Sequence, residues 1–348
     1  METVWFCLVA IMIAAYVVLD GFDLGAGAIH FLVAKTDEER HLVVRSIGPV
    51  WDGNEVWLLA AGGTLYFAFP ALYASGFSGF YLPLMIVLWL LILRGVSIEF
   101  REKVESPVWV KFWDVVFAAA SLLLAVFYGA ALGNVVRGVP LNDKGYFFEA
   151  LWTNFRLGTA TGILDWYTIL VGLAALSTLS LHGALWLAVK TDGPVHDRSE
   201  RWARVAWWVV LLLTFVVTAV TFRVQAQVPH NLSAHPAGFV FPLLALTGLA
   251  AMGWFIRRND DLPSFLASCL YIVGMLTSVV FGLYPLVLPA STSPAYSLTI
   301  YNAKAGDYGL RVGLVWWIVG MALASAYFTY VYRHFSGKVK IEGGVNRY

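Results

Sequence analysis

The sequence predicts an all-α integral membrane protein that crosses the bilayer about nine times. Of its 348 residues, 59% are hydrophobic and 13% are charged, whereas soluble domains lie nearer one half and one quarter. The formal net charge of +1 and the two cysteines exclude a nucleic-acid binder and a disulfide scaffold. No hydrophilic stretch is long enough for a soluble domain. Residues 1–348 are therefore expected to form a single transmembrane domain.

Apolar runs recur along the chain with the length that a spanning helix needs. A bilayer core of about 30 Å takes about 20 mostly apolar residues in a helix. The runs that meet this length are 3–34, 50–70, 76–97, 112–136, 161–189, 203–222, 238–256, 263–288 and 310–333.

The basic residues between these runs predict the orientation. With the N-terminus outside and the C-terminus in the cytoplasm, the inner connections hold 17 of the 23 Lys and Arg residues, Arg94 included, and the outer connections hold six. Lys and Arg are concentrated on the cytoplasmic side of membrane proteins. The asymmetry therefore favours nine crossings in this orientation.

The first apolar run carries two acids and a glycine pattern. Asp20 and Asp23 are three residues apart, which puts both carboxylates on one helix face, and Gly21 and Gly25 form a GxxxG helix-packing pattern. An unbroken helix over 3–34 would be about 48 Å long. It must tilt, protrude or change course, and we expect the irregularity in the glycine-rich stretch. The acids indicate either proton or cation handling or a packing seam with capped carboxylates.

A second polar cluster begins the next run. Asp52 and Glu55 are again three apart, Asn54 lies between them, and Trp51 and Trp57 flank the set. Acids just inside the inner boundary suit proton uptake from the cytoplasm. The alternative is that Asp52 only stabilises the helix N-terminus through its dipole.

Arg94 and Glu99 lie at the inner end of the third run. They are either a pair at the membrane interface, or Glu99 extends an acidic path from Asp52. Asp114 and Asp165 lie near span ends, where capping or ion pairing is the simpler interpretation. His182 is interpreted as a hydrogen-bonded packing residue.

No ligand set for a cofactor is evident in the chain. Cys7 and Cys269 lie apart in apolar runs and make no metal motif, and no convincing pair of facing histidines is available for haem. We therefore expect neither a bound metal nor a catalytic residue here. In the stretch 283–303, Pro285 and Pro289 break the eighth predicted span, and the polar, uncharged run after them predicts a loop that either folds over a partner or simply connects two helices.

These segments together resemble subunit II of the cytochrome bd family of quinol oxidases. The resemblance follows the chain from end to end, and GPVWDGNEVWLL is its most specific part, because an Asp-Gly-Asn-Glu set between two tryptophans is rare by chance. The matching segments are DGFDLGAG (20–27), GPVWDGNEVWLL (48–59), FSGFYLPL (77–84), RGVSIEFR (94–101), and YPLVLPAST followed by SLTIYNA (284–303).

The resemblance implies roles for individual residues. Asp52 matches the principal acid of a proton path from the cytoplasm, and Glu99 matches a deeper acid that is often Asp in the family. Asp20 and Asp23 match further acids, and Trp57 lies where an apolar route for O₂ begins. Beside this path, Glu55 would be a further proton-handling group and Trp51 a second wall.

The resemblance also implies the surroundings of the chain. In the family, subunit I carries haem b558, haem b595, haem d and the quinol-oxidising loop, and subunit II holds it in a bacterial inner membrane. Small accessory subunits occur, and some members hold a structural quinone in subunit II. Membrane lipid and quinol are the other expected partners, and nucleic acid is not.

Two other functions remain open at this point. A proton- or cation-coupled secondary transporter would explain paired acids beside a glycine-broken helix, although no inverted repeat is visible. A purely structural scaffold would use the same acids only in ion pairs with basic residues.

Overall fold

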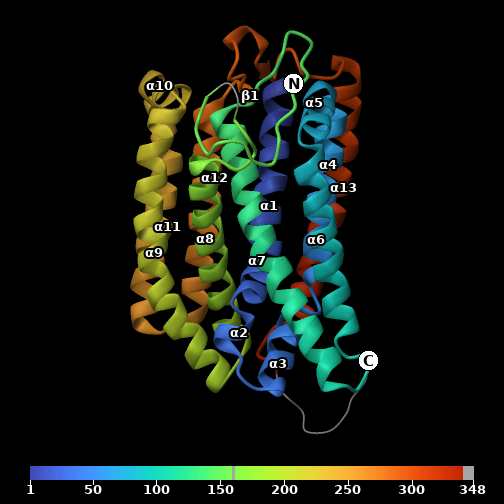
Figure 1. The fold of residues 1–348 in the computed structure, drawn as a ribbon, viewed down its shortest axis with the longest axis vertical. Coiled ribbons are helices and arrows are strands. Elements are labelled where there is room, and N and C mark those ends of the chain that lie inside the picture. Colours follow the sequence, from blue (N-terminus) through green and yellow to red (C-terminus); the bar gives the residue numbers. More distant parts are fainter. Residues whose placement is uncertain (159–160, 340–348) are drawn as a thin grey trace.

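The molecule is a bundle of long helices that lie side by side (Figure 1). The structure is a computed structural model, and it describes residues 1–158 and 161–339. The elements are α1 (Glu2–Ala28), α2 (His30–Val33), α3 (Asp37–Ile47), α4 (Trp51–Ala68), α5 (Pro70–Gly79), α6 (Tyr81–Phe100), α7 (Pro107–Arg137), α8 (Trp166–Lys190), α9 (Pro194–Val224), α10 (Gln227–Ala234), η1 (Pro236–Phe239), α11 (Val240–Arg258), α12 (Asp261–Leu283), β1 (Leu286–Leu288), η2 (Pro294–Tyr296), β2 (Leu298–Thr299) and α13 (Asp307–His334).

The predicted fold class is confirmed. Eight helices in the described part of the chain are long and apolar enough to cross a membrane, and they are α1, α6, α7, α8, α9, α11 with η1, α12 and α13. The remaining predicted span, 50–70, corresponds to α4, an 18-residue helix that carries Asp52 and Glu55 and is not among these eight. Nine crossings therefore remain a prediction.

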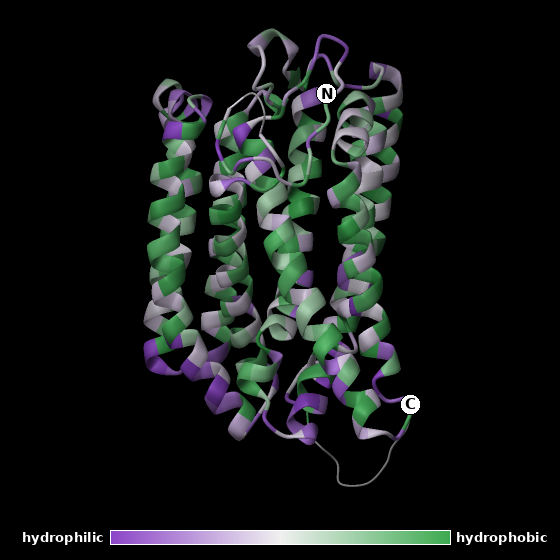
Figure 2. Ribbon diagram, in the orientation of Figure 1, coloured by the Kyte–Doolittle hydropathy of each residue, from purple (hydrophilic) through white to green (hydrophobic). Residues whose placement is uncertain are grey.

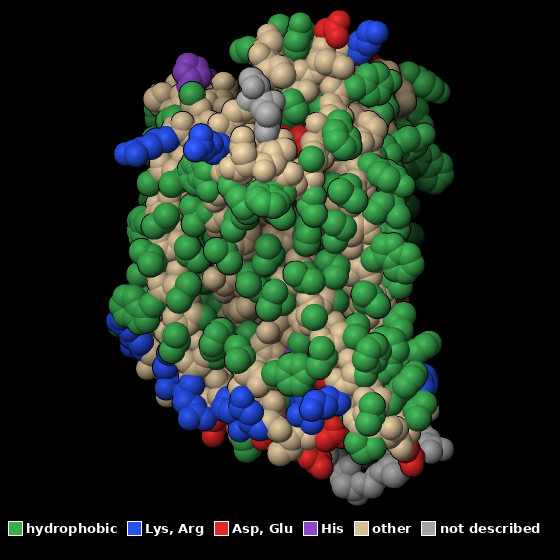
Figure 3. All heavy atoms as spheres, in the orientation of Figure 1, with side chains coloured by type: hydrophobic (Ala, Val, Ile, Leu, Met, Phe, Trp, Pro, Cys, Tyr) green, Lys and Arg blue, Asp and Glu red, His purple; other side chains and the backbone are tan. Residues whose placement is uncertain are grey.

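Hydropathy divides the bundle into a green apolar middle and two more polar ends (Figure 2). The end that carries α2 and α3 is called the inner end below, and the end where α1 begins is called the outer end (Figure 1). On the face in Figure 3, Lys and Arg side chains gather mainly at the inner end. This distribution agrees with the predicted orientation, which stays a prediction.

Several predicted boundaries differ from the observed ones; the span predicted from 203, for example, begins at Pro194. The glycine-rich stretch is regular helix, and α1 ends only at Ala28, because Ile29 leaves helical geometry (φ −99°, ψ 8°) before the short α2. The span predicted from 161 begins at Trp166, where Asp165 caps α8. The span predicted to 288 ends at Leu283, and the chain then enters a small antiparallel hairpin of β1 and β2.

The centre of the bundle is formed around α1, which packs against α4, α7, α8 and α12. The α1–α8 seam is close because Gly25 lies against the α8 backbone at Leu179 and Gly183, where a Cβ atom would overlap the Leu179 carbonyl group. Gly21 lies further along the same seam, beside the Leu179 side chain. By contrast, α13 buries only Leu310, so most of its apolar surface faces outward.

Candidate functional site

One cluster of buried charge lies toward the inner end, where side chains of α1, α4 and α6 meet. Arg94 of α6 donates two hydrogen bonds to Asp20 of α1, from Nη1 to Oδ2 at 2.7 Å and from Nη2 to Oδ1 at 2.5 Å. Both side chains have no exposed surface. Such a two-point contact fixes both partners, because the guanidinium plane matches the two carboxylate oxygens.

This pairing corrects the interpretation of Arg94 as an interface residue beside Glu99. The sequence places Arg94 near a charged connection, but the helix turns its side chain toward α1, into the bundle. Arg94 therefore does not belong to the inner connection. Its partner, Asp20, lies 74 residues away in the chain.

Glu55 of α4 is the second carboxylate beside Arg94. Its Oε2 atom lies 3.3 Å from Arg94 Nη2, and its side chain is 24% exposed. Glu55 thus contacts the buried Asp20–Arg94 pair while part of its own side chain is exposed at the surface of α4. The pair and Glu55 together hold two carboxylates and one guanidinium.

A hydrogen-bonded chain runs from α1 through α4 to α13 beside this pair. Asn54 donates from Nδ2 to Asp23 Oδ2 at 2.8 Å and to the Leu19 carbonyl oxygen at 3.1 Å. Tyr332 donates its hydroxyl to Asn54 Oδ1 at 2.8 Å. Asp23 is fully buried, and its Oδ1 atom has no hydrogen-bond partner among the described residues. Sequence reasoning did not single out Tyr332, because a tyrosine near the end of an apolar helix is usual.

The two acids expected to lead the proton path lie on the surface of this chain. Asp52 is in the first turn of α4, and Glu99 is one residue before the end of α6. Both are exposed. Neither acid therefore joins the buried cluster. Of the two acids on α4, only Glu55 contacts it.

The two tryptophans of α4 pack against the neighbouring helices. The Trp51 ring lies against α6, 3.3 Å from where a Cβ atom on Gly95 would stand. The Trp57 ring lies 5.5 Å from the ring of Phe328 on α13. These rings flank the stretch of α4 that carries Asn54 and Glu55.

A second buried charge cluster lies at the inner end, around Asp114 of α7. Its carboxylate is bonded by His30 Nε2 at 3.1 Å and by Arg101 Nε at 2.7 Å, and Arg40 Nε lies 3.0 Å away. The interpretation of Asp114 as an ion-paired residue is therefore correct. The cluster ties α2, α3 and α7 to Arg101, the residue that directly follows α6.

His182 is a packing residue, as its sequence position predicted. Its Nε2 atom lies 2.9 Å from the Val18 carbonyl oxygen, and Nδ1 lies 2.7 Å from Ser268 Oγ. Its ring stacks on Phe265. Both of its ring nitrogens are thus engaged in contacts within the bundle.

The outer end holds a third charge cluster, built by Arg137 at the end of α7. Arg137 pairs with Asp165 and donates to Glu149 Oε1 at 2.7 Å. Asp165 caps α8 by accepting from the backbone N–H groups of Tyr167 and Thr168, so its interpretation as a cap or pair is correct in both senses. Burial of the Glu149 side chain away from water raises its pKa to about 7, because the contacts with Arg137 and Thr161, which lower the pKa, only partly offset the loss of hydration.

Sequence reasoning missed Glu149, because a glutamate in an outer connection is usually exposed. The only available signal was the neighbouring Arg137 at the end of a long apolar run.

Comparison with known proteins gives one consistent result. The family model described as "Cytochrome bd terminal oxidase subunit II" matches residues 1–335. The "Probable cytochrome oxidase subunit 2" of Haemophilus influenzae is 30% identical over 97% of this chain and 94% of its own length. The "Cytochrome bd ubiquinol oxidase subunit 2" of Bacillus subtilis is 31% identical over 90% and 89%.

A relative from Escherichia coli, the "Cytochrome bd-I ubiquinol oxidase subunit 2", is 29% identical over 89% of this chain and 87% of its own length. Among solved structures, a chain of the bd oxidase from Geobacillus thermodenitrificans superimposes with a TM-score of 0.73, at 16% identity, over 96% of this chain and 98% of that one. The structural likeness supports the fold.

Proposed function

The chain belongs to the cytochrome bd oxidase subunit II family, and from this premise we propose that it is the non-haem subunit of a quinol:O₂ oxidoreductase of the aerobic respiratory chain. Its relatives are named as subunits 2 of quinol oxidases, which implies a subunit I as the partner. This family membership favours the oxidase over a secondary transporter. The complex resides in the bacterial cytoplasmic membrane, as the multi-pass fold and the inner basic residues suggest.

We propose that subunit I covers the side of the bundle that α4, α6 and α13 present. Asp52 and Glu99 are exposed on α4 and α6, and α13 buries almost none of its surface within this chain. A carboxylate facing lipid costs about 3 kcal/mol at the centre of a span on insertion scales and less toward the span ends, where Asp52 and Glu99 lie. A second protein with water or polar groups at this surface would remove that cost. The same contact would let this chain hold and stabilise the haem-bearing subunit.

The proposed proton path starts at Asp52 and continues to Glu55, three residues further along α4. Glu55 carries the argument, because its carboxylate is partly exposed and also reaches Arg94 in the buried cluster. Arg94 uses two N–H groups to hold Asp20, which fixes the cluster's geometry. Asp23 keeps one oxygen without a partner and is the buried carboxyl best placed to receive a proton.

Glu99 would serve the same path from α6, and Trp51 and Trp57 would form its walls. An O₂ route beginning near Trp57 is part of the same proposal, since that ring faces α13 on the side assigned to subunit I. The haems are assigned to subunit I, where they supply electron transfer and O₂ binding when bound. A structural quinone and a small accessory subunit remain expectations drawn from the family.

The proposal is tested with Asp52→Asn and Glu55→Gln in the purified complex, each of which removes a titratable proton and keeps the side-chain shape. We expect quinol oxidase turnover to fall at least tenfold in each variant while the haem spectrum is unchanged. Glu38→Gln, at an exposed glutamate of α3, is the matched control and should keep full turnover. Normal turnover of Asp52→Asn with intact haems would reject Asp52 as the first acid of the path.

A further inference from the structure

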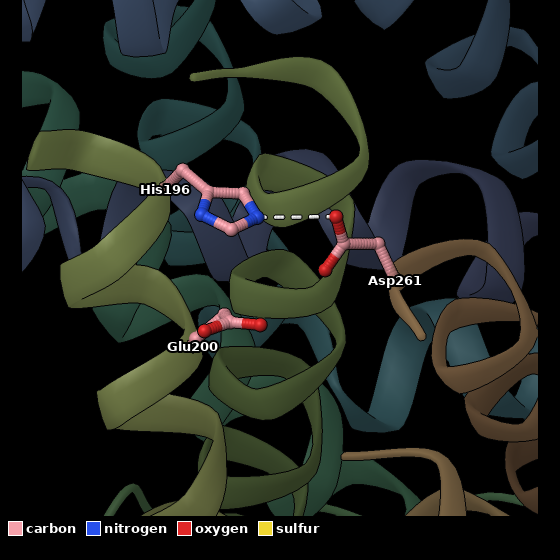
Figure 4. A group of neighbouring side chains, drawn as sticks. All are labelled: His196, Glu200 and Asp261. Carbon is pink, nitrogen blue, oxygen red and sulfur yellow. Dashed lines mark hydrogen bonds and ion pairs between the residues drawn. The ribbon is translucent and has the colours of Figure 1, made fainter. Parts of the chain in front are cut away.

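Three metal-ligating side chains converge at the inner end, away from the proposed proton path. His196 and Glu200 lie in the first turns of α9, and Asp261 is the first residue of α12. Figure 4 shows the His196 ring directed at Asp261, with the Glu200 carboxylate on the same side of α9. Their ligand atoms all lie within 4.8 Å of one another. The side chains are partly exposed, so an ion from the cytoplasm could reach them.

The spacing of two ligand atoms already matches a metal centre. His196 Nε2 lies 3.1 Å from Asp261 Oδ2. In a tetrahedral zinc site with bonds of about 2.0–2.1 Å, neighbouring ligand atoms are about 3.3 Å apart. An ion could therefore replace the shared proton between these atoms with little movement of either side chain.

The other ring nitrogen of His196 has the partner that metal-binding histidines usually have. Nδ1 lies 3.3 Å from Asp197 Oδ1. When Nδ1–H donates to a carboxylate, the ring orientation is fixed and the Nε2 lone pair is left for the metal. Asp197 is thus placed as the supporting residue of the site.

Glu200 needs only a side-chain rotation to complete the set. Its present partner is Arg204, at 3.1 Å, and this exposed i,i+4 pair is weak. Arg204 would retain its 2.7 Å hydrogen bond to Asn259 Oδ1. Beside these groups lies a cavity of about 10 Å³, lined by Glu200, Asp260 and Asp261 among others, which is roughly the space of one water-sized sphere.

We propose that His196, Glu200 and Asp261 bind one divalent transition-metal ion, with Zn²⁺ as the ion that their nitrogen and oxygen ligands suit best. Water would complete the coordination, because the site is open to the cytoplasm. The ion would link the first turns of α9 to the start of α12. This site was not expected from the sequence, since His196 and Asp261 are 65 residues apart.

The test uses the purified complex, stripped with a chelator, loaded with Zn²⁺ and desalted before metal analysis. We expect the unmodified complex to hold one more zinc ion than His196→Gln or Glu200→Gln. Competition with a fluorescent zinc chelator should show at least a tenfold rise in Kd for each variant. Haem spectrum and turnover without zinc should stay unchanged, because neither residue belongs to the proposed proton path.

His41→Gln is the matched control, because His41 also pairs with a glutamate, Glu102, at the inner end. It should bind zinc like the unmodified complex. The proposal is overturned if Glu200→Gln, with intact haems, binds zinc with unchanged affinity, or if His41→Gln loses as much zinc as His196→Gln. In either case Glu200 and Asp261 would only stabilise the N-terminal ends of α9 and α12 through the helix dipoles.

Discussion

The Asp20–Arg94 pair gives the sharpest test of how this bundle is held together. Arg94→Gln removes a guanidinium that has no exposed surface and makes two hydrogen bonds to Asp20. The variant leaves the Asp20 carboxylate buried without a cation. Removal of one partner of a buried pair costs about 3–5 kcal/mol. Loss of the contact to Glu55, which is partly exposed, adds little to this.

The double variant separates the ion pair from the loss of a large side chain. Adding Asp20→Asn to Arg94→Gln removes the stranded charge, so part of the lost stability should return. We expect a coupling of about 2 kcal/mol or more between the two positions, as for other residues in direct contact. The assay is unfolding of the purified complex by detergent denaturant, followed through the haem spectrum and near-ultraviolet circular dichroism.

Lys103→Gln is the control, because Lys103 is an exposed cation just beyond the end of α6. It should change the free energy of unfolding by less than about 0.5 kcal/mol. A cost of less than about 1 kcal/mol for Arg94→Gln, or additive effects of the Asp20 and Arg94 substitutions, would show that the buried pair does not hold α1 and α6 together.

Three further predictions concern other parts of the molecule. Because burial raises the pKa of Glu149 to about 7, the folded chain holds a proton that the unfolded chain loses from about pH 4.5 upward. The free energy of unfolding should therefore fall by about 3 kcal/mol as pH rises from 4.5 through 7. Glu149→Gln should flatten this part of a plot of thermal midpoint against pH. An unchanged slope would contradict the raised pKa of Glu149. Gly25→Ala should destabilise the complex by about 1–3 kcal/mol, since a Cβ atom there meets the α8 backbone, whereas Gly76→Ala, in open space, should be nearly neutral in the same thermal assay. Asp165→Ala should speed hydrogen exchange in the first turn of α8 and cost about 1–2 kcal/mol for the lost cap alone, besides the cost of the lost ion pair with Arg137. Asp165→Asn, which can still cap the helix, should exchange more slowly than the alanine variant.

The helices could be predicted because lipid imposes a simple rule on the sequence. Every backbone polar group in the bilayer must be bonded within the segment, so long apolar runs become helices. The boundaries that failed depend on local geometry instead. Asp165 starts α8 because its side chain accepts two backbone N–H groups, and the chain after Leu283 leaves the helix for the β1–β2 hairpin.

The partners inside the bundle could not be predicted from one sequence. Arg94 lies five residues from Glu99, which made a local pair plausible, but five residues in a helix put two side chains on different faces. Its true partner, Asp20, lies on α1, and one sequence does not show which helices bring their side chains together. Tyr332 was missed for the same reason, since its partner Asn54 is distant in the chain. Glu149 was missed because a glutamate in an outer connection is usually exposed.

Proton uptake during a single turnover tests the central claim most directly. The complex is reconstituted in vesicles with its inner end facing the medium, reduced, and mixed with O₂, and a pH dye in the medium records proton uptake. We predict that Asp52→Asn slows uptake at least tenfold relative to Glu38→Gln while the haem spectrum stays intact. Equal uptake rates in the two variants, with intact haems, would contradict the claim that this subunit carries the protons.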